Sequence, residues 1–300
     1  MKRAVVFGGS GFLGSHVADE LTSKGYEVVI FDRSPSSFLS ANQTMIVGDI
    51  LDREHVRKVV ESVEVVYHFA AIADIYEARE KPVEAAHFNI MGTMYILDAC
   101  REFGISRFVY SSTIYVYSDH GSFYRSSKQA CELFIENYHK EYQLPFTILR
   151  YGSLYGPRAN SFNFIRNTII AALTTRKIER EGDGNEVRDY INVIDAARSS
   201  VDILEEEYAN NYVMITGPQT MRVREILEMI KEMLNNEVEI EYKNGSFSGH
   251  YQITPYSFKP KVALKIIPKN YHDLGQGILE CIYDIYGSLQ KNGSTNLLKP

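Results

Sequence analysis

A tyrosine and a lysine, Tyr124 and Lys128, carry the clearest chemical signal in this sequence. They stand at i and i+4 in a segment with helical spacing, so the phenol and the ammonium share one helix face. A nearby ammonium favours the phenolate, which predicts that the pKa of Tyr124 falls below its ordinary value of about 10. Such a phenol is a general base for an alcohol near neutral pH. The pair therefore points to alcohol oxidation or ketone reduction, provided that a hydride carrier binds beside it.

The segment before this pair supplies a third reactive group. Residues 108–113 form an apolar, aromatic run that predicts a buried strand ending in the hydroxyls of Ser111, Ser112 and Thr113. Thr113 is best placed to hold the oxygen that reacts with Tyr124. A Y-x-x-x-K spacing also arises by chance in a chain with 21 tyrosines, so the pair alone does not decide the function. A nucleotide site elsewhere in the chain would strengthen it.

Such a site is predicted at the start of the chain. Residues 3–7 form a short β-branched strand, and G-G-S-G-F-L-G (8–14) follows it directly. A helical pattern then runs to Gly25, and a second strand, 27–31, ends at Asp32. Glycines let backbone N–H groups approach a pyrophosphate at the helix N-terminus, and the acid accepts hydrogen bonds from the adenosine ribose. The pattern predicts dinucleotide binding; a glycine-rich turn without a ligand is the alternative.

The residues after the second strand bear on the choice of cofactor. Asp32 would repel the 2′-phosphate of NADP, which favours NAD. Arg33 lies directly beside it and would accommodate that phosphate. NAD is therefore the predicted cofactor, with NADP as the alternative.

Strands and helices alternate through the first half of the chain. Further strands are predicted at 44–47, 63–69 and 146–149, and helices at 52–62 and 82–102. This alternation predicts an α/β fold of the Rossmann type, with a doubly wound parallel sheet covered on both faces. Ligands bind at the carboxyl ends of such strands. One edge of the sheet is therefore expected to carry the residues that follow the strands: Asp32, Asp49, Ala70, Thr113 and Tyr151.

The regular alternation of strands and helices ends after Gly156-Pro157. Helices are expected at 161–176, 194–206, 222–234 and 271–286, and strands at 212–216 and 238–242. We predict an NAD-binding Rossmann domain and a smaller, mixed α/β substrate lobe. The domain boundaries are 1–160 with a return of roughly 189–204 for the first, 161–188 and 205–287 for the second, and a frayed polar tail at 288–300.

Composition excludes several classes of partner. A net charge of −6 and a pI near 5.8 do not show the excess of positive charge that is typical of proteins that bind nucleic acid. The absence of a run of 18 apolar residues argues against a membrane span, and the N-terminus carries no recognisable leader. The three cysteines are widely spaced and form no metal-binding pattern, so we expect reduced packing residues, no metal and a cytoplasmic protein.

At this point the motifs resemble those of the extended short-chain dehydrogenase/reductase family, in its NAD-dependent epimerase/dehydratase branch, which includes UDP-glucose 4-epimerase-like members. The resemblance covers the chain to about residue 235. The matching motifs, in chain order, are G-G-S-G-F-L-G, G-D-I, H-F-A-A, N-I-M-G-T, Y-S-S-T, Y-R-S-S-K, L-R-Y-G-S-L-Y-G-P-R and G-D-G-N-E-V-R-D-Y-I-N-V.

The resemblance implies roles for individual residues. The implied catalytic set is Thr113, Tyr124 and Lys128. The expected cofactor-binding residues are Gly8, Gly11, Phe12, Leu13, Asp32, Arg33, Asp49, Ile50, Phe69, Ala70, Ala71, Asn89, Ser111, Tyr124, Lys128 and Tyr151. The expected substrate-binding residues are Ala73, Thr113, Ser153, Asn163, Arg188 and Tyr251.

Arg188 resembles the family arginine that contacts the substrate diphosphate, and a guanidinium fork suits phosphate oxygens. A surface ion pair with Asp189 or another neighbour is the alternative. The late arginine of the family's substrate lobe is not evident, and Lys259 or Lys261 is a candidate to replace it.

The sequence departs from the family pattern after the catalytic hydroxyl. The 4,6-dehydratases carry Asp-Glu directly after the threonine, and the decarboxylating members carry a glutamate there. Ile114 and Tyr115 occupy those positions here, which argues against both reactions. Ala73 and Ser153 stand where sugar 4-epimerases often have a lysine and an asparagine, so the identity of the sugar stays open.

These features favour an NAD-dependent nucleotide-sugar epimerase that acts at C4 through a keto intermediate. A net NAD(P)-dependent oxidoreductase with the same catalytic set is the alternative, because the first half-reaction is shared. A non-catalytic dinucleotide-binding module is a third reading, although such proteins commonly lose the tyrosine or the lysine. Family members dimerise through the helices that correspond to 83–101 and 124–142, so a homodimer is expected; two simply buried helices are the alternative.

Overall fold

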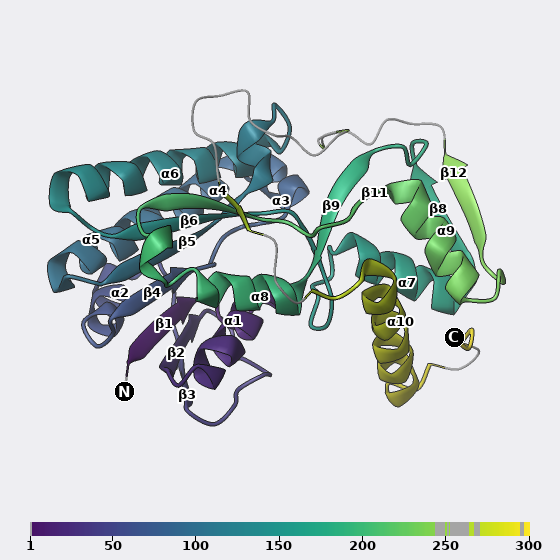
Figure 1. Cartoon of the computed structure of the whole chain (residues 1–300), viewed down its shortest axis with the longest axis horizontal. Helices are drawn as coiled ribbons and strands as arrows, with labels where there is room; N and C mark the ends of the chain where they lie inside the picture. The colour runs from purple at the N-terminus through teal and green to yellow at the C-terminus, as the bar shows by residue number, and fades with distance from the viewer. Residues whose placement is uncertain (1, 244–249, 251, 253–263, 267–270, 295–296) are drawn as a thin grey trace. The chain divides into compact units, whose positions relative to one another are not determined.

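The computed structural model describes residues 2–243, 250, 252, 264–266, 271–294 and 297–300. Their contacts divide the chain into two compact units (Figure 1). The first comprises the described residues of 1–151, 196–215 and 255–266, and the second those of 152–195, 216–254 and 267–300.

The first unit is built on one sheet of parallel strands in the order β13-β10-β6-β5-β4-β1-β2-β3. Its strands are β1 (Arg3–Phe7), β2 (Glu27–Asp32), β3 (Gln43–Val47), β4 (Val65–His68), β5 (Arg107–Thr113), β6 (Phe146–Tyr151), β10 (Asn211–Ile215) and β13 (Leu264–Ile266). The order reverses between β1 and β4, where a doubly wound sheet opens a crevice for a dinucleotide. The structure therefore confirms the predicted Rossmann-type fold.

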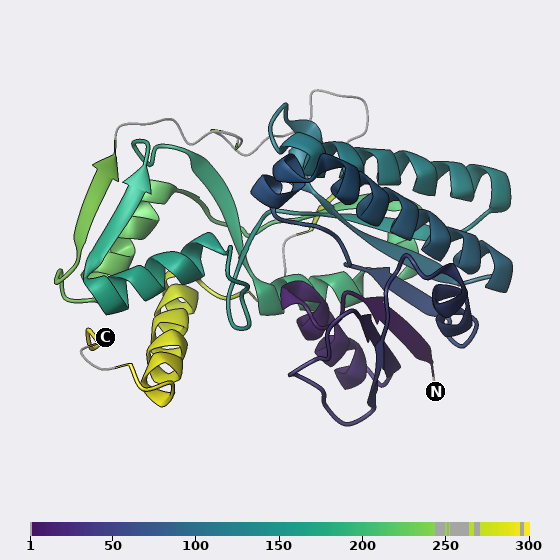
Figure 2. The same ribbon diagram turned by 180° about the vertical axis from the view of Figure 1, so that it is seen from behind.

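Helices cover both faces of this sheet. They are α1 (Phe12–Ser23), α2 (Arg53–Val60), α3 (Ile75–Glu80), α4 (Pro82–Ala86), α5 (Gly92–Phe103), α6 (Ser122–Tyr142) and α8 (Val193–Asp202). Helices α5 and α6 run side by side along one face in both views (Figures 1 and 2). On the other face α1 and α8 are joined by an ion pair between Lys24 and Asp202, at 3.3 Å. Apolar strand residues are buried between the layers, including Phe7, Phe31 and Phe108.

One helix departs from its predicted form. The pattern over 82–102 predicts a continuous α-helix, but the chain forms α4, a π-helical turn (His87–Met91) and then α5. The wider turn places Asn89 inside the unit, where the exposed fraction of this residue is 2%. Single π-turns within α-helices occur frequently at functional sites. The pattern alone also misses α3, whose first N–H groups are capped by Asp74.

The second unit has its own core and two small sheets. Its strands are β7 (Ser153–Tyr155), β8 (Lys177–Glu181), β9 (Val187–Asn192), β11 (Thr220–Arg222) and β12 (Glu239–Lys243), and its helices are α7 (Phe164–Thr175), α9 (Val223–Met233) and α10 (Leu274–Lys291). The sheets have the orders β11-β9-β7 and β12-β8. Apolar side chains of the three helices pack into one cluster, including Ile169, Leu227 and Ile278.

The predicted polar tail at 288–300 differs from the structure at the end of the chain. Helix α10 continues to Lys291, past the predicted start of a polar tail at residue 288. Within the tail, Leu298 is buried and its N–H donates to the Leu173 carbonyl oxygen at 2.9 Å. The prediction of a frayed tail is therefore wrong for this residue, because its apolar side chain joins the core of the second unit.

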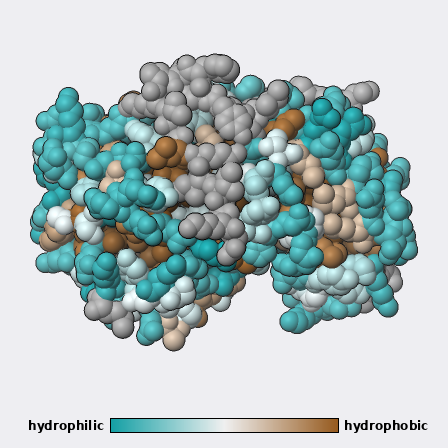
Figure 3. All heavy atoms as spheres, viewed as in Figure 1, coloured by the Kyte–Doolittle hydropathy of each residue, from teal (hydrophilic) through white to brown (hydrophobic). Residues whose placement is uncertain are grey.

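The surface shown in Figure 3 is mostly hydrophilic, with smaller apolar patches. Among the helices that the structure describes, none has the length and apolar character needed to cross a bilayer. All three cysteines lie in the described part of the chain, where they are buried and unpaired.

Candidate active site

The glycine turn between β1 and α1 is shaped so that side chains are excluded. Gly8 has a φ of +81°, and a Cβ on Gly14 would lie 2.2 Å from the Gly8 carbonyl oxygen. Gly11 precedes α1 without a side-chain cap, and the first turn of the helix carries no acidic residue. Its N–H groups and the positive end of the helix dipole suit a pyrophosphate. The residues present therefore fit the predicted dinucleotide.

Asp32 ties the end of β2 to this turn. Its Oδ2 accepts a hydrogen bond from the Ser10 N–H and its Oδ1 from the Ser34 N–H, both at 3.1 Å. Each carboxylate oxygen has a second lone pair that suits a ribose hydroxyl. The neighbouring Arg33 guanidinium lies over the Phe88 ring, 4.4 Å from its centroid.

The ends of β3 and β4 carry further predicted cofactor residues. Asp49 accepts a hydrogen bond from the Leu51 N–H at 2.9 Å, and Ile50 is buried. The N–H groups of Phe69 and Ala70 both donate to the Phe7 carbonyl oxygen, at 2.8 and 3.0 Å. These bonds hold the end of β4 against the end of β1, beside the glycine turn.

Asn89 links the π-helical turn to two other parts of the unit. Its Oδ1 accepts from the Ile72 N–H at 2.7 Å, and its Nδ2 donates to the Ile72 carbonyl oxygen and to Ser127 Oγ at 3.1 and 3.0 Å. The amide thus fixes the segment after β4 against α6. In the first unit, Tyr151 at the end of β6 shares a 2.6 Å hydrogen bond with Ser200.

The predicted catalytic residues come together at the ends of β5 and α6. Thr113 is the last residue of β5, while Tyr124 and Lys128 occupy the first turns of α6. A side-chain hydrogen bond joins Tyr124 to Thr113 and favours the phenolate. Lys128 Nζ donates to the Ser111 carbonyl oxygen at 2.7 Å and lies 5.8 Å from the Tyr124 ring centroid. The structure therefore brings the three residues into one cluster.

The predicted electrostatics of this cluster are wrong in one respect. Burial raises the pKa of Tyr124 to about 12, although the Thr113 hydrogen bond acts in the opposite direction. The Lys128 ammonium does not overcome this burial, because it is directed to the Ser111 carbonyl oxygen and lies over the ring. Burial also lowers the pKa of Lys128 to about 8. In the protein alone, Tyr124 is a neutral phenol at pH 7.

A buried polar layer lies beneath Lys128. The Tyr110 ring is 4.8 Å from Nζ, measured to its centroid. Burial, followed by the charge of Lys128, lowers the pKa of His68 to about 3, so this imidazole is neutral. Its Nε2 lies 2.9 Å from Thr93 Oγ1, whose hydroxyl donates to the Asn89 carbonyl oxygen. Nε2 therefore carries the proton, and Nδ1 is buried without a partner in the described structure.

The predicted substrate residues are divided between the units. Ala73 is exposed in the first unit. In the second, Ser153 begins β7, and Asn163 caps α7 by accepting from the Arg166 N–H at 3.1 Å. Arg188, on β9, is a buried residue with an exposed fraction of 7%, and its side chain donates to the Val187 carbonyl oxygen. Tyr251, Lys259 and Lys261 lie outside the described residues.

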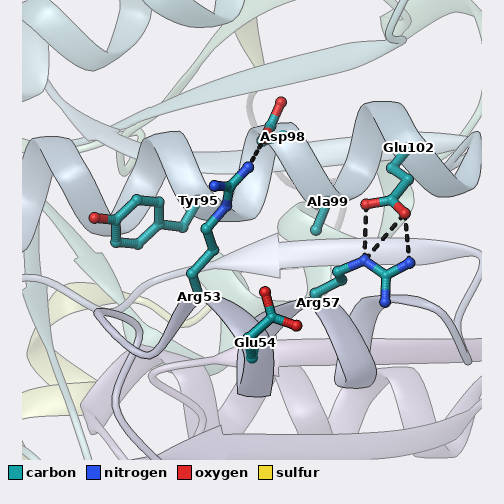
Figure 4. Close-up of a pocket in the computed structure, with 7 residues that line it drawn as sticks. All are labelled: Arg53, Glu54, Arg57, Tyr95, Asp98, Ala99 and Glu102. Atoms are coloured by element: carbon teal, nitrogen blue, oxygen red, sulfur yellow. Dashed lines mark hydrogen bonds and ion pairs between the residues drawn. The ribbon is translucent and has the colours of Figure 1, made fainter.

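A small surface pocket lies elsewhere in the first unit, between α2 and α5 (Figure 4). Four of its charged side chains form two ion pairs: Arg53 with Asp98 at 2.8 Å, and Arg57 with Glu102 at 2.5 Å. No predicted site residue lines it. We interpret it as a solvated contact between two helices, because four of its charged side chains pair with one another. Exposed ion pairs of this kind contribute little stability.

Sequence reasoning missed two charged residues next to the catalytic cluster, Glu132 and Arg150. Glu132 Oε2 lies 2.6 Å from Arg150 Nη2, and both side chains are buried. Glu132 continues the i, i+4 series from Tyr124 and Lys128, which is a signal that could have identified it.

Comparison with known proteins assigns the family. The model of the NAD dependent epimerase/dehydratase family matches residues 4–215. The chain belongs to this family. The epimerase/dehydratase match confirms the resemblance and NAD as the family's cofactor, and it spans the glycine turn, Asp32 and the catalytic cluster.

Relatives within the epimerase/dehydratase family catalyse different reactions. The chain is 30% identical over 265 residues to UDP-N-acetyl-alpha-D-glucosaminuronate decarboxylase from Bacillus cytotoxicus, covering 80% of this chain and 82% of that protein. It is 29% identical over 292 residues to a putative UDP-glucose 4-epimerase from Methanocaldococcus jannaschii, covering 87% and 94%. The relatives are thus all enzymes, but their names do not agree on one reaction.

A solved structure of a nucleotide-sugar epimerase has a similar fold. The crystal structure of UDP-glucose 4-epimerase from Thermotoga maritima, solved with UDP-glucose, matches with a TM-score of 0.84 and 24% identity. The match covers 96% of this chain and 99% of that chain. This match supports a shared fold over the part of the chain that it covers.

Proposed function

We propose that this protein is an NAD-dependent nucleotide-sugar epimerase that acts at C4 through a keto intermediate. The observation that carries this proposal is the cluster of Thr113, Tyr124 and Lys128, where one hydroxyl and one ammonium surround a tyrosine at the start of α6. The glycine turn and Asp32 belong to the same compact unit. NAD, when bound, supplies reversible hydride transfer at the carbon that bears the reacting hydroxyl.

Each residue of the cluster has a distinct role in this proposal. Tyr124 takes the proton from the sugar hydroxyl and later returns it, as general base and then acid. Thr113 donates a hydrogen bond that stabilises negative charge on the tyrosine oxygen and steadies the sugar oxygen. Lys128 supplies the positive charge that makes a phenolate less costly. Because burial holds the pKa of Tyr124 near 12 in the protein alone, formation of the phenolate needs added positive charge nearby.

The segment after Thr113 argues against dehydration and decarboxylation. Ile114 is buried and apolar, and Tyr115 follows it. The first carboxylate after Thr113 is Asp119, whose exposed side chain lies 3.5 Å from Arg125. Expulsion of water from a sugar needs an acid within hydrogen-bonding reach of the leaving group. Neither Ile114 nor Tyr115 can provide that carboxylic acid.

The substrate class follows from the relatives and from one residue of the second unit. Two similar proteins are named for UDP-linked sugars. Arg188 provides a guanidinium on β9 for the diphosphate of such a substrate. We assign Ala73, Ser153, Asn163 and Tyr251 to the sugar and nucleotide as further substrate-binding residues.

We also infer a homodimer and a cytoplasmic location. Helix α6 carries apolar side chains that are exposed in the single chain: Phe123, Leu133, Phe134 and Tyr142. Pairing of α5 and α6 with a second copy would cover them. The three unpaired cysteines suit a reducing compartment. Light scattering of the purified protein tests the dimer, because a monomeric mass at micromolar concentration would contradict it.

The function is tested by incubating the purified protein with NAD and either UDP-glucose or UDP-N-acetylglucosamine. We expect the C4 epimer to form while absorbance at the nicotinamide band stays constant. Continuous formation of NADH would instead support a net oxidoreductase. Mass spectrometry of the cofactor released from the folded protein distinguishes NAD from NADP. A protein that binds NAD but converts neither sugar, nor any other nucleotide hexose, would refute the epimerase proposal.

A further inference from the structure

Three consecutive residues at the end of β5 are each bound by a residue on one face of α6. Thr113 bonds to Tyr124, and the Ser111 carbonyl oxygen accepts from Lys128 at 2.7 Å. Between them, Ser112 Oγ donates to Glu132 Oε1 at 2.6 Å. Residues 124, 128 and 132 follow the i, i+4 spacing, so they lie on one helix face. Glu132 thus belongs to the row that carries the proposed catalytic residues.

Glu132 is held in turn by Arg150 of β6. Arg150 Nε and Nη2 donate to the two oxygens of Glu132, at 3.0 and 2.6 Å. Arg150 lies opposite Ser112 in the register of β5 and β6. The exposed fractions of the Arg150 and Glu132 side chains are only 4% and 8%. A fork of two parallel charge-assisted hydrogen bonds fixes direction as well as distance.

The same guanidinium reaches the short segment between Thr113 and Tyr124. Arg150 Nη1 donates to the Tyr117 hydroxyl at 2.5 Å, and its Cζ lies 4.6 Å from the Tyr117 ring centroid. The centroid of the Tyr212 ring lies 4.4 Å from the same Cζ. Arg150 therefore contacts two segments. It binds α6 through Glu132, and it binds the segment between Thr113 and Tyr124 through Tyr117.

A purely structural role is a poor explanation for this pair. A buried ion pair often contributes no more stability than apolar side chains of similar volume. The pair does provide a fixed register between β5 and α6, which apolar side chains would leave looser. Displacement of a reacting group by about 1 Å can lower a rate on the order of 100-fold.

We propose that Glu132, oriented by Arg150, is a positioning residue that sets Tyr124 and Lys128 against Thr113 for the reaction. This inference rests on the proposed function. Glu132 acts through Ser112 and the backbone of α6 and does not contact the substrate. Its carboxylate also supports the charged form of Lys128.

The electrostatic part of this role can be measured without substrate. The groups that face Lys128 are Tyr110 from β5, His68 from β4, and Tyr124, Cys131 and Glu132 from α6. Burial lowers the pKa of Lys128 to about 8, whereas Cys131 and Glu132 act to raise it. Loss of the carboxylate charge therefore lowers the pKa of Lys128 further.

The test uses Glu132→Gln, with Glu141→Gln at the exposed end of the same helix as the control. Glu132→Gln keeps the size of the side chain and an acceptor for Ser112. We expect kcat to fall on the order of 10-fold to 100-fold with KM for the nucleotide sugar little changed. Nitrogen NMR of Lys128 Nζ in the NAD-bound protein is expected to show a titration midpoint at lower pH in Glu132→Gln alone. An unchanged kcat or an unchanged midpoint would overturn the proposal.

A second variant separates positioning from folding. Glu132→Met with Arg150→Met removes both charges together and avoids leaving one of them buried and unpaired. We expect this double variant to melt near the wild-type temperature and still to lose kcat. Wild-type kcat in a folded double variant would show that the pair is only structural. If the double variant does not fold, the decision rests on Glu132→Gln. Failure of the wild-type protein to convert any sugar would refute the proposed function, while the NMR midpoint would still test the role of Glu132.

Discussion

Lys128 and Ser111 form the contact that fixes the position of the buried ammonium in the catalytic cluster. Lys128 Nζ lies 2.7 Å from the Ser111 carbonyl oxygen, to which it donates a hydrogen bond. The ammonium is therefore anchored to the main chain of β5 and lies over the Tyr124 ring. Burial keeps the Tyr124 phenol protonated in the protein alone, and the ammonium in this position does not offset that effect. Lys128 is also held in a buried position, where burial disfavours its charged form.

Replacement of Tyr124 by phenylalanine tests the proton transfer. Tyr124→Phe removes the group that exchanges a proton with the sugar, so we expect kcat to fall by about 10²-fold to 10⁴-fold. Tyr142→Phe, on the same helix but at a residue that is 52% exposed, is expected to keep wild-type kcat. The measurement is steady-state epimerisation of a nucleotide sugar, and near-normal turnover by Tyr124→Phe would exclude this tyrosine as the general base.

The buried charge of Lys128 predicts a pH dependence of stability. Its folded-state pKa of about 8 lies below the usual 10.5, so the unfolded chain binds the proton more tightly. Charging the folded lysine therefore opposes folding at pH 7, and this cost disappears as pH rises from about 8 to 10.5. We expect the free energy of unfolding of wild type, relative to Lys128→Met, to rise by about 1.4 kcal/mol per pH unit in that window.

Urea unfolding at several pH values measures this difference. Lys140→Met serves as the control because Lys140 is exposed on the same helix, and its difference from wild type is expected to be flat. A flat difference for Lys128→Met as well would mean that Lys128 titrates normally.

His68 predicts a second pH dependence, on the acid side. Its folded-state pKa of about 3 lies below the usual 6.5, so the unfolded chain gains a proton first as pH falls. Wild type is therefore expected to lose stability relative to His68→Gln between pH 6.5 and 3, by about 1.4 kcal/mol per pH unit. Glutamine retains a donor for Thr93 but does not titrate. His120→Gln, at an exposed position, should show no such trend in the same unfolding measurements.

The glycine turn predicts a steric effect. A Cβ at Gly14 would come within 2.2 Å of the Gly8 carbonyl oxygen, which is backbone and has little room to move. We expect Gly14→Ala to destabilise the protein by about 1–3 kcal/mol and to weaken NAD binding. Gly287→Ala is the matched control, because, apart from the adjoining residues and backbone of its own helix, no described atom lies within 4 Å of the added carbon, and alanine favours the helix. Calorimetric melting and NAD titration check both variants, and unchanged NAD affinity in Gly14→Ala would show that the turn does not hold the cofactor.

Much of the first unit could be predicted because its signals are local. The glycines at 8, 11 and 14 follow a β-branched strand, and Tyr124 and Lys128 follow the apolar, aromatic strand at 108–113. Residue spacing alone therefore identifies the glycine turn and the catalytic pair. Burial is different, because it depends on residues far apart in the chain. The pKa of Tyr124, the π-helical turn around Asn89, and the bonds from Arg150 to Glu132 each require the tertiary structure.

The order of strands in the first unit has a consequence for biosynthesis. Strand β6 pairs with β10 on its outer side, and β10 begins only at Asn211, after a large part of the second unit has been made. Until then a nascent chain presents β6, with Arg150 and Tyr151, as an open sheet edge. Open edges of this kind promote association between chains. Aggregation during synthesis should therefore be greatest for chains truncated between residues 151 and 211.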